Sequence, residues 1–286
     1  MRRRIGSREV FAVGLGGMPM SIAGRPTEAR SRATIHAALD AGVELIDTAD
    51  VYCKDHTEIG HNERLIASAL KERADRANLL VATKGGLERP AGAWTSNGHP
   101  AHLQKACEAS LKALGVERID LYQLHAPDED VPLADSVGAL AALQAQGKIG
   151  MVGLSNVTVA EIEEARTIVD VVSVQNRCGP FDRTAWDDGV LPLCEKHGIA
   201  FLPWGPMGGK RGKQTVARDE ALITVGRNHG ISPFQTVIAW LLAKSPVMIP
   251  IPGASRPENA TDSAGAAGVR LLPRDLAILD RVFPIE

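Results

Sequence analysis

Short apolar runs alternate with longer amphipathic stretches along most of this chain. The apolar runs are FAVGLGGM (11–18), ELIDTA (44–49), LLVATKG (79–85), IDLYQLH (119–125), MVGLSN (151–156), VVSVQN (171–176), IAFLPWG (199–205) and VMIPIPG (247–253). The amphipathic stretches predict helices near residues 27–41, 62–73, 100–114, 133–146, 158–168, 185–197, 216–243 and 257–267. Strands that are apolar along almost their whole length are typical of a parallel sheet covered by helices. The pattern therefore predicts eight β-α units and an α/β fold of the (β/α)8 TIM-barrel type.

Glycines mark the ends of several predicted helices. Gly42, Gly115, Gly147 and Gly198 each follow an amphipathic stretch and precede an apolar run. A glycine directly after a helix can adopt the left-handed conformation that ends it. These four positions support the same division into units.

Two segments lie outside the eight units. The residues RRRIGSREV (2–10) predict a short N-terminal hairpin that turns at Gly6 and Ser7, and PRDLAILDRVF (273–283) has the spacing of an extra C-terminal helix. The alternative fold is a doubly wound open sheet, which shares the β-α rhythm. Its GxGxxG fingerprint is missing, because GLGG (14–17) lacks the third glycine and Pro19 stands where a helix would begin.

The composition favours one domain, residues 1–286, with a large core. The chain is 44% hydrophobic and 23% charged, and no Pro/Ser-rich or charged linker divides it. It has 32 Lys and Arg against 34 Asp and Glu, which gives a net charge of −2. This balance argues against nucleic acid or an anionic membrane as a partner. A monomer is the simpler expectation, although an oligomer stays open.

The start of the chain and its cysteines predict a cytoplasmic protein. The basic residues of MRRRIGSREV are not followed by the apolar segment of a secretory signal, and no apolar run approaches about 18 residues. The four cysteines have no CxxC or similar metal-binding spacing, and we expect free thiols and no metal site. They are Cys53, Cys107, Cys178 and Cys194.

Four titratable residues fall at the carboxyl ends of successive predicted strands. They are Asp47, Tyr52, Lys84 and His125. A parallel barrel gathers these strand ends around one pocket. An ammonium about 4 Å from a phenol stabilises its phenolate by roughly 4 kcal/mol at an effective dielectric near 20, before the opposing cost of burial. We expect Lys84 to make Tyr52 a usable proton donor, Asp47 to keep Lys84 charged, and His125 to bind an incoming oxygen or to help transfer its proton.

The motifs DTADVY, VATKGG, DLYQLH, GKIGMVGLSN and VQN occur in order along the chain, and together they resemble the signatures of the aldo-keto reductase family. The resemblance runs nearly from end to end. It implies a (β/α)8 barrel that binds NADPH/NADP+ at the carboxyl rim and reduces aldehydes and ketones to alcohols. It also implies that Tyr52 donates the proton, that Lys84 and Asp47 tune it, and that His125 orients the carbonyl.

The same resemblance implies three groups of cofactor-binding residues. The nicotinamide would meet Ser155, Asn156 and Gln175 and stack on Trp204, where many members have tyrosine. The composition of the glycine-rich segment GPMGGKRGKQ (205–214) suits a mobile flap over the pyrophosphate, and a solvated surface loop is the alternative. The resemblance implies that the 2′-phosphate would meet Ser255 and Arg256. The full set is Gly17, Met18, Ser155, Asn156, Gln175, Trp204, Gly205, Met207, Gly208, Ser255, Arg256 and Asn259.

Loop residues at the rim are the candidates for substrate contacts. Met20, Trp94 and Cys178 are the main ones, with Met18 and Cys53 beside them. The chain ends soon after its last predicted helix, so no long C-terminal loop is expected to cover a bulky substrate. A small carbonyl compound is the expected substrate class, and no physiological compound follows.

Two other functions stay open. A lysine at a barrel strand end can form a Schiff base with a carbonyl compound, so Lys84 could serve an aldolase. That hypothesis leaves Tyr52, the GLSN and VQN segments and Trp204 without a role. A protein of this kind could also bind NADPH as a regulatory, non-catalytic subunit, although the complete set of four titratable residues argues against it.

Overall fold

The computed structural model describes residues 1–71 and 73–284, and its centre is a curled parallel sheet. Neighbouring strands pair in the order β11-β10-β9-β8-β5-β4-β3, and all of these pairs are parallel. Their bounds in chain order are β3 (Leu15–Gly16), β4 (Leu45–Asp47), β5 (Leu80–Gly85), β8 (Ile119–Leu124), β9 (Ile149–Ser155), β10 (Val171–Gln175) and β11 (Ala200–Phe201).

The eighth predicted strand, residues 247–253, closes the sheet through hydrogen bonds on both sides. On one side, the N–H groups of Ile249 and Ile251 donate to β11 and the residues after it. On the other side, the carbonyls of Pro250 and Pro252 accept from Gly14 and Gly16. A proline has no N–H to donate, so this segment makes bridges and not a regular ladder. The predicted (β/α)8 barrel is confirmed, with a closing strand that is irregular for this reason.

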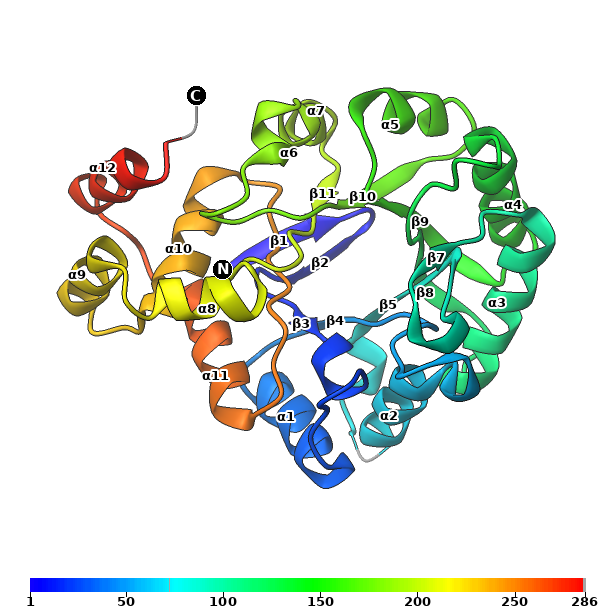
Figure 1. Cartoon of the computed structure of the whole chain (residues 1–286), viewed down its shortest axis with the longest axis horizontal. Helices are drawn as coiled ribbons and strands as arrows, with labels where there is room; N and C mark the ends of the chain where they lie inside the picture. The colour runs from blue at the N-terminus through cyan, green and yellow to red at the C-terminus, as the bar shows by residue number, and fades with distance from the viewer. Residues whose placement is uncertain (72, 285–286) are drawn as a thin grey trace.

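Helices surround the barrel, as Figure 1 shows. Those that follow the first five strands are α1 (Glu28–Asp40), α2 (His61–Leu70), α3 (Pro100–Leu114), α4 (Leu133–Ala145) and α5 (Val159–Arg166). The later helices are α6 (Thr184–Asp187), α7 (Val190–His197), α8 (Gly209–Val216), α9 (Glu220–His229), α10 (Pro233–Lys244), α11 (Pro257–Gly265) and α12 (Pro273–Val282). The expected helix at 185–197 is therefore two helices, and α8 lies where a loop was expected.

Local sequence explains where several helices begin and end. Thr158 and Glu161 form a capping box at the start of α5, and Ser232 and Gln235 form another at the start of α10. Gly115 ends α3 with φ +64°, as predicted. The other three predicted terminator glycines also have positive φ values. The carboxyl ends of the helices were thus readable from the sequence.

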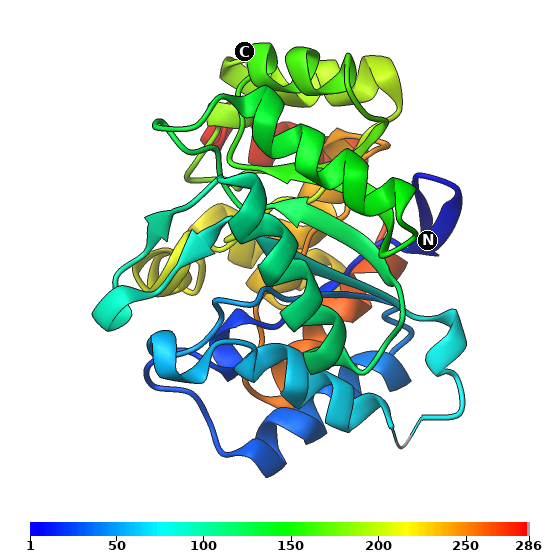
Figure 2. The same ribbon diagram turned by 90° about the vertical axis from the view of Figure 1, so that its right-hand side faces the viewer.

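The two predicted additions to the barrel are both present. Strands β1 (Arg2–Ile5) and β2 (Arg8–Phe11) form an antiparallel hairpin across one end of the barrel, seen in blue in Figures 1 and 2. From it, Ile5 and Val10 point into the barrel and pack with Leu45, Leu80 and Leu121. The hairpin therefore plugs the amino-terminal end of the barrel. The C-terminal helix α12 packs outside, against α9.

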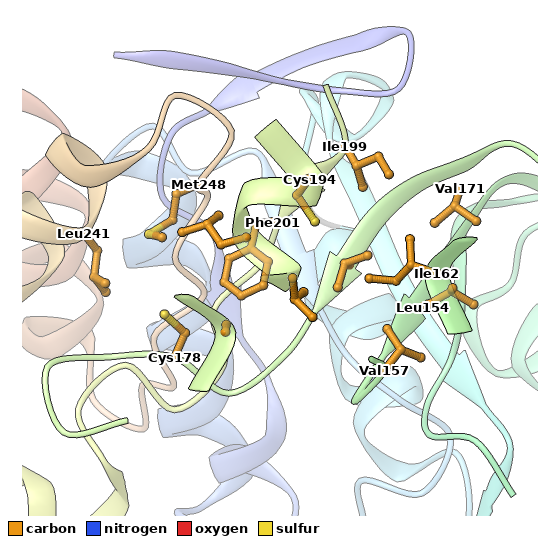
Figure 3. Close-up of a cluster of buried hydrophobic side chains, with 14 of the residues drawn as sticks. Leu154, Val157, Ile162, Val171, Cys178, Cys194, Ile199, Phe201, Leu241 and Met248 are labelled. Carbon is orange, nitrogen blue, oxygen red and sulfur yellow. The ribbon is translucent and has the colours of Figure 1, made fainter. Parts of the chain in front are cut away.

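The largest hydrophobic cluster lies between the strands and the outer helices. Figure 3 shows part of it, where Phe201 of β11 lies near Met248 of the closing segment and Leu241 of α10. The hairpin fills the amino-terminal end of the barrel, and a buried polar cluster that includes Asp47, Lys84 and Gln175 lies at its carboxyl-terminal end. A second hairpin, β6 (Leu87–Glu88) with β7 (Thr95–Ser96), extends there from the end of β5.

Candidate active site

Lys84 is the centre of the polar cluster at the carboxyl-terminal end of the barrel. It lies at the end of β5 with no exposed surface, and β4 ends at Asp47 beside it. Its Nζ donates to Asp47 Oδ2 at 2.9 Å, to the Thr48 carbonyl at 2.8 Å and to the Tyr52 hydroxyl at 3.0 Å. Nζ also lies 2.7 Å from Asp47 Oδ1. Three of the four residues predicted from strand ends are thus in direct contact.

Two glutamines hold the other side of Asp47. Gln175 Nε2 donates to Asp47 Oδ1 at 2.8 Å, and Gln123 Nε2 approaches the same oxygen at 3.5 Å. Gly153 makes room for Gln123, because a Cβ there would lie 3.0 Å from its Cγ and 2.2 Å from Ser173 Oγ. The buried carboxylate therefore has a cation on one side and amide donors on the other, which offsets the cost of burying it.

Burial keeps Tyr52 protonated more strongly than the sequence suggested. Only 6% of this residue is exposed, and burial raises the pKa of its phenol to about 12, although Lys84 acts in the opposite direction. Lys84 lowers this pKa, as expected, but the opposing cost of burial is larger. Tyr52 is therefore protonated, and Lys84 is positioned to stabilise the phenolate that forms if the proton is transferred.

Lys84 is positively charged, whereas His125 is neutral. Burial alone lowers the pKa of Lys84, but Asp47 and Tyr52 together raise it above its ordinary value, so this lysine is cationic. Burial, assisted by Lys84, lowers the pKa of His125 well below its usual value. His125 is therefore a neutral imidazole whose ring lies 5.6 Å from the Tyr52 ring, edge to face. A neutral imidazole can donate one hydrogen bond to an oxygen without adding charge.

An aromatic side chain stands beside the reactive groups. Trp94, from the loop between η4 (Pro90–Gly92) and β7, is 46% exposed. Its ring lies 6.4 Å from Tyr52 and 6.4 Å from His125, in both cases edge to face. The guanidinium of Arg89 stacks on the Trp94 ring at 3.8 Å. Of the predicted substrate-contact residues, Trp94 is placed where a substrate could touch it.

A second polar group lies at the ends of β9 and β10. Asn156 has φ +57°, a left-handed conformation that costs energy for a residue other than glycine but is commonest for Asn and Asp. Its Nδ2 donates to the His125 carbonyl at 2.9 Å, and its Oδ1 accepts from Trp204 Nε1 at 3.1 Å. Ser155 Oγ donates to the Gln175 carbonyl at 2.8 Å. These contacts orient the half-buried indole of Trp204 at the rim.

The expected flap is mostly a helix. Gly208 caps the start of α8, and both Gly208 and Gly209 have positive φ values, +66° and +69°. Gly212 lies inside α8, and only glycine fits there, because a Cβ would be 2.0 Å from the Met207 carbonyl oxygen. Met207 is buried in the core, Gly205 and Gly208 are half-buried, and Gly209, Arg211 and Lys213 are exposed. The prediction of a loop over residues 209–214 is wrong, because it rests on the glycines there as a sign of a loop. Gly212 instead allows α8 to pack closely against Met207.

The segment predicted to bind a 2′-phosphate leads directly into α11. Ser255 is half-buried, Arg256 is exposed at the N-cap, and Asn259 is exposed in the first turn. No side chain caps this helix start. The first-turn N–H groups of a helix favour an anion. Ser255, Arg256 and Asn259 thus lie together at this helix start, and their contact with a 2′-phosphate stays a prediction.

Several other predicted contacts do not reach an open surface. Cys178 is fully buried, and Figure 3 shows it in the core near Phe201. Met20 is 1% exposed and packs in the core between α1 and the barrel. A substrate cannot touch side chains without exposed surface, so neither belongs to the substrate site. Cys53 is also fully buried, whereas Met18 is 37% exposed beside the rim.

Gly17 serves the loop that follows β3. Its N–H donates to the Asp47 carbonyl, and its carbonyl accepts from Asn62 Nδ2 at 2.9 Å. A Cβ at this position would lie 2.4 Å from Asn62 Oδ1, so only glycine fits. Gly17 lies next to Asp47, and both its N–H and its carbonyl group are already hydrogen-bonded to other residues of the chain.

Sequence reasoning missed Gln123 and Asn62. Gln123 stands two residues before His125 on β8, and alternate strand residues share a face, so its inward position was readable. Asn62 begins α2 and bonds to Gly17 and to the Ser21 and Thr48 hydroxyls. No sequence pattern connects these segments, because their contact depends on how α2 packs against the loop after β3.

Two kinds of feature are absent from the described residues. Within residues 1–71 and 73–284, no group of three or more His, Cys, Asp or Glu side chains is arranged to hold a metal ion. In that same part of the chain, none of the helices is long and apolar enough to cross a membrane. All four cysteines are free, as predicted.

The fold and site define a class: a (β/α)8 barrel with a buried Asp–Lys–Tyr cluster and a neutral histidine at its carboxyl-terminal rim. The model of the aldo/keto reductase family matches residues 12–283. The chain therefore belongs to the aldo/keto reductase family of oxidoreductases. The resemblance seen in the sequence is confirmed.

Similar proteins extend the comparison. An uncharacterized oxidoreductase of Schizosaccharomyces pombe is 36% identical over 283 residues, which cover 97% of this chain and 88% of that protein. The structure of an aldo-keto reductase from Klebsiella pneumoniae in complex with NADPH has 26% identity and a TM-score of 0.83, covering 100% of this chain and 95% of that one. The glycerol dehydrogenase of Gluconobacter oxydans has 28% identity and a TM-score of 0.84, covering 98% and 94%.

Proposed function

We propose that this protein is an NADPH-dependent reductase that converts small aldehydes or ketones to alcohols. The observation that carries the proposal is the Lys84 cluster, in which one buried ammonium touches both a carboxylate and a phenol. This arrangement supplies a proton at the point where a carbonyl oxygen becomes an alcohol. Membership in the aldo/keto reductase family supports the same reaction class.

The residues at the rim fit a nicotinamide dinucleotide. Trp204 presents a flat aromatic face held by Asn156, and stacking of a ring on such a face is favourable. The start of α11, with Ser255, Arg256 and Asn259, suits a phosphate group. The similar structure from Klebsiella pneumoniae contains NADPH. When bound, NADPH provides hydride for the carbonyl carbon.

The chain's own residues provide the proton and the alignment. His125, being neutral, donates a hydrogen bond to the carbonyl oxygen and so holds it toward Tyr52. As negative charge develops on that oxygen, Tyr52 transfers its hydroxyl proton to it. An alkoxide, like hydroxide, binds a proton more tightly than a phenolate does, so transfer from Tyr52 is favourable even with its pKa raised to about 12. Lys84 Nζ, 3.0 Å away, stabilises the phenolate that remains.

The same geometry disfavours a Schiff-base mechanism. A nucleophilic lysine must be neutral, but Asp47 and Tyr52 raise the pKa of Lys84. Its three hydrogen bonds also point at acceptors on the protein. Lys84 is therefore placed to hold charge and not to attack a carbonyl carbon.

The deciding experiment pairs binding with turnover on the purified protein. Fluorescence titrations with NADPH and NADH would be followed by the loss of nicotinamide absorbance with aromatic aldehydes, 2-oxoaldehydes and ketones. NADPH-dependent turnover supports the reductase. Tight NADPH binding without turnover across the panel would favour a regulatory subunit, and failure of both cofactors to bind would overturn the proposal.

Arg256→Ala tests the cofactor preference separately. We expect its affinity for NADPH to fall roughly tenfold, while its affinity for NADH changes little, because only NADPH carries the phosphate that a guanidinium would bind. Arg270→Ala is the matched control, since Arg270 is also exposed but lies beyond α11. Equal losses for both cofactors in Arg256→Ala would remove this residue from the role.

A further inference from the structure

A separate cavity lies on the outer side of the barrel wall from Lys84. Its volume is about 470 Å³, and it lies between the β6–η4 segment, the turn η2 (His56–Glu58) and α3. The cavities that bind small molecules typically measure about 300–1,000 Å³. Its apolar lining includes Ile59, Leu87 and Ala109. None of the residues proposed above for the reaction or for NADPH lines it.

Arg89 gives the cavity a buried cation. Only 6% of this residue is exposed, and its Nη2 donates to the carbonyls of Cys53 and Lys54 at 3.2 and 3.0 Å. Among the described residues, no group accepts a hydrogen bond from Arg89 Nε or Nη1. Buried donors are nearly always satisfied, so two unpaired donors on one guanidinium call for a partner. A carboxylate is the partner that matches this fork of donors best.

The other charged groups around the cavity also favour an anion. Lys105 and His102 of α3 line it, and His102 Nε2 has no hydrogen-bond partner in the described part of the chain. Glu88 lines it too, but its Oε1 lies 3.5 Å from His102 Nδ1 and accepts a hydrogen bond from Asn97 Nδ2. Asp50 lines it as well, and burial together with Glu63 raises the pKa of this carboxyl well above the usual value, which disfavours its charged form.

We propose that this cavity binds a small organic carboxylate, with its charge at Arg89 and His102 and its apolar body against Ile59, Leu87 and Ala109. An inorganic anion would satisfy the guanidinium but would leave the apolar lining in contact with water. A neutral ligand would fill the lining but leave the donors unpaired. The site also touches the proposed active site, because Arg89 stacks on Trp94 and Trp94 meets Tyr52 and His125.

The test measures binding directly and needs no catalytic activity. The probe is 4-fluorobenzoate, followed by fluorine NMR at constant ionic strength, with 4-fluorobenzamide as the neutral analogue and inorganic phosphate as the anion without an apolar body. We expect 4-fluorobenzoate to bind at least about tenfold more tightly than either, because only it meets both requirements of the cavity. Equal affinity for the amide would overturn the proposal.

Variants locate the bound probe. Lys105→Gln should weaken 4-fluorobenzoate binding roughly threefold by removing a nearby charge, whereas Lys112→Gln, on the same helix but outside the cavity, should not. Ala109→Trp should abolish binding by filling the cavity, without changing the charge. Neither change touches Arg89, whose own substitution could disturb folding through the Cys53 and Lys54 carbonyls.

The barrel rim is the competing location. Trp204→Leu alters the proposed nicotinamide face and leaves the cavity intact, so we expect it to leave 4-fluorobenzoate affinity unchanged. Loss of binding in Trp204→Leu, or normal binding in Ala109→Trp, would place the probe at the rim and refute the cavity site. Because these readouts do not involve turnover, they can fail while the proposed reductase function holds.

Discussion

The chain has only two tyrosines: Tyr52 lies in the loop after β4, beside the polar cluster, and Tyr122 lies on β8 and packs in the hydrophobic shell between strands and helices. The Tyr52 hydroxyl accepts a hydrogen bond from Lys84 Nζ at 3.0 Å, and its pKa is raised to about 12. Tyr122 on β8 is fully buried, its hydroxyl has no hydrogen-bond partner among the described residues, and its pKa is raised well above the usual value. Both phenols keep their protons, but only one has a cation beside it.

The carboxyl groups show the same contrast. Inside the wall, Asp47 is paired with Lys84 and two glutamine amides. Outside the wall, Asp50 and Glu63 are buried near each other, and burial raises the pKa of each. Glu63 Oε1 accepts from the Thr83 hydroxyl at 2.6 Å, and Thr83 is the neighbour of Lys84 on β5.

Successive residues of one strand thus serve two chemically different regions. Lys84 points into the barrel, where charges are paired, and Thr83 contacts Glu63, a carboxyl group whose pKa is raised by burial. Burying a charge is costly unless a partner compensates it, so an unpaired acid gives up its charge instead. We therefore expect the reactivity of Tyr52 to depend on its contact with the Lys84–Asp47 ion pair, and not on burial alone.

Replacing each tyrosine with phenylalanine is the strongest test of this comparison. We expect Tyr52→Phe to lower the turnover number for a carbonyl substrate by at least about 100-fold, because general acid catalysis contributes roughly 10²–10⁴. NADPH affinity should stay within a few-fold, since the phenol acts on the substrate oxygen. Tyr122→Phe is the control and should keep turnover within about twofold. Steady-state rates decide it, and normal turnover in Tyr52→Phe would refute the mechanism.

Lys84→Met tests the charge pairing through stability. Removing one member of a buried ion pair costs roughly 3–5 kcal/mol, because the other charge stays buried without compensation. Denaturant unfolding should therefore show a large loss in Lys84→Met. The double variant Asp47→Asn/Lys84→Met should recover more than half of it. Failure of the second change to restore stability would show that Asp47 does not depend on Lys84.

Glu63→Gln tests the neutral region through pH. The pKa of Glu63 is raised from its ordinary value of 4.5 in the folded chain, so its favourable contribution is complete below that value and is lost as pH rises through the folded pKa. Each unit of the rise corresponds to about 1.4 kcal/mol. We expect the melting temperature of wild type to fall as pH rises above about 4.5, and that of Glu63→Gln to fall less.

The control for this pH series is Glu117→Gln, at an exposed position away from the cluster. It should show the pH dependence of wild type. If Glu63→Gln and wild type fall in parallel, then Glu63 is ionised in the folded protein and the contrast between the two regions is wrong.

The smallest expected effect is on the stability of Tyr122→Phe. Its hydroxyl makes no hydrogen bond with any described residue, and it lies so close to Gly85 that a Cβ there would be 2.1 Å from it. Removing an unsatisfied buried hydroxyl is neutral or stabilising, so the free energy of unfolding should change by less than about 1 kcal/mol. A clear loss in denaturant unfolding would reveal a partner for this hydroxyl.

Much of the fold was readable because its signals are local. Apolar runs identified the strands, and the glycines at 42, 115, 147 and 198 identified helix ends, since a left-handed residue ends a helix wherever it occurs. The helix α8 was missed because its glycines are a signal of loops. They are explained only by contacts such as that of Gly212 with the Met207 carbonyl.

The site divides in the same way. The sequence determined which side chains stand at the strand ends, because a parallel barrel brings all of those ends to one rim. It therefore predicted the grouping of Asp47, Tyr52, Lys84 and His125. It did not identify Cys178 and Met20 as core residues, because burial of a loop side chain depends on the elements that pack over it.

The sequence by itself determined the barrel, its hairpin plug, and the identity of the groups at the carboxyl-terminal rim, because periodicity and strand order act along the chain. Only the tertiary structure decided how those groups are charged. The pKa of Tyr52 is set by a balance between burial and the distance to Lys84, and the state of His125 by burial. Both quantities depend on atoms that come together from distant segments, so they have no local signature.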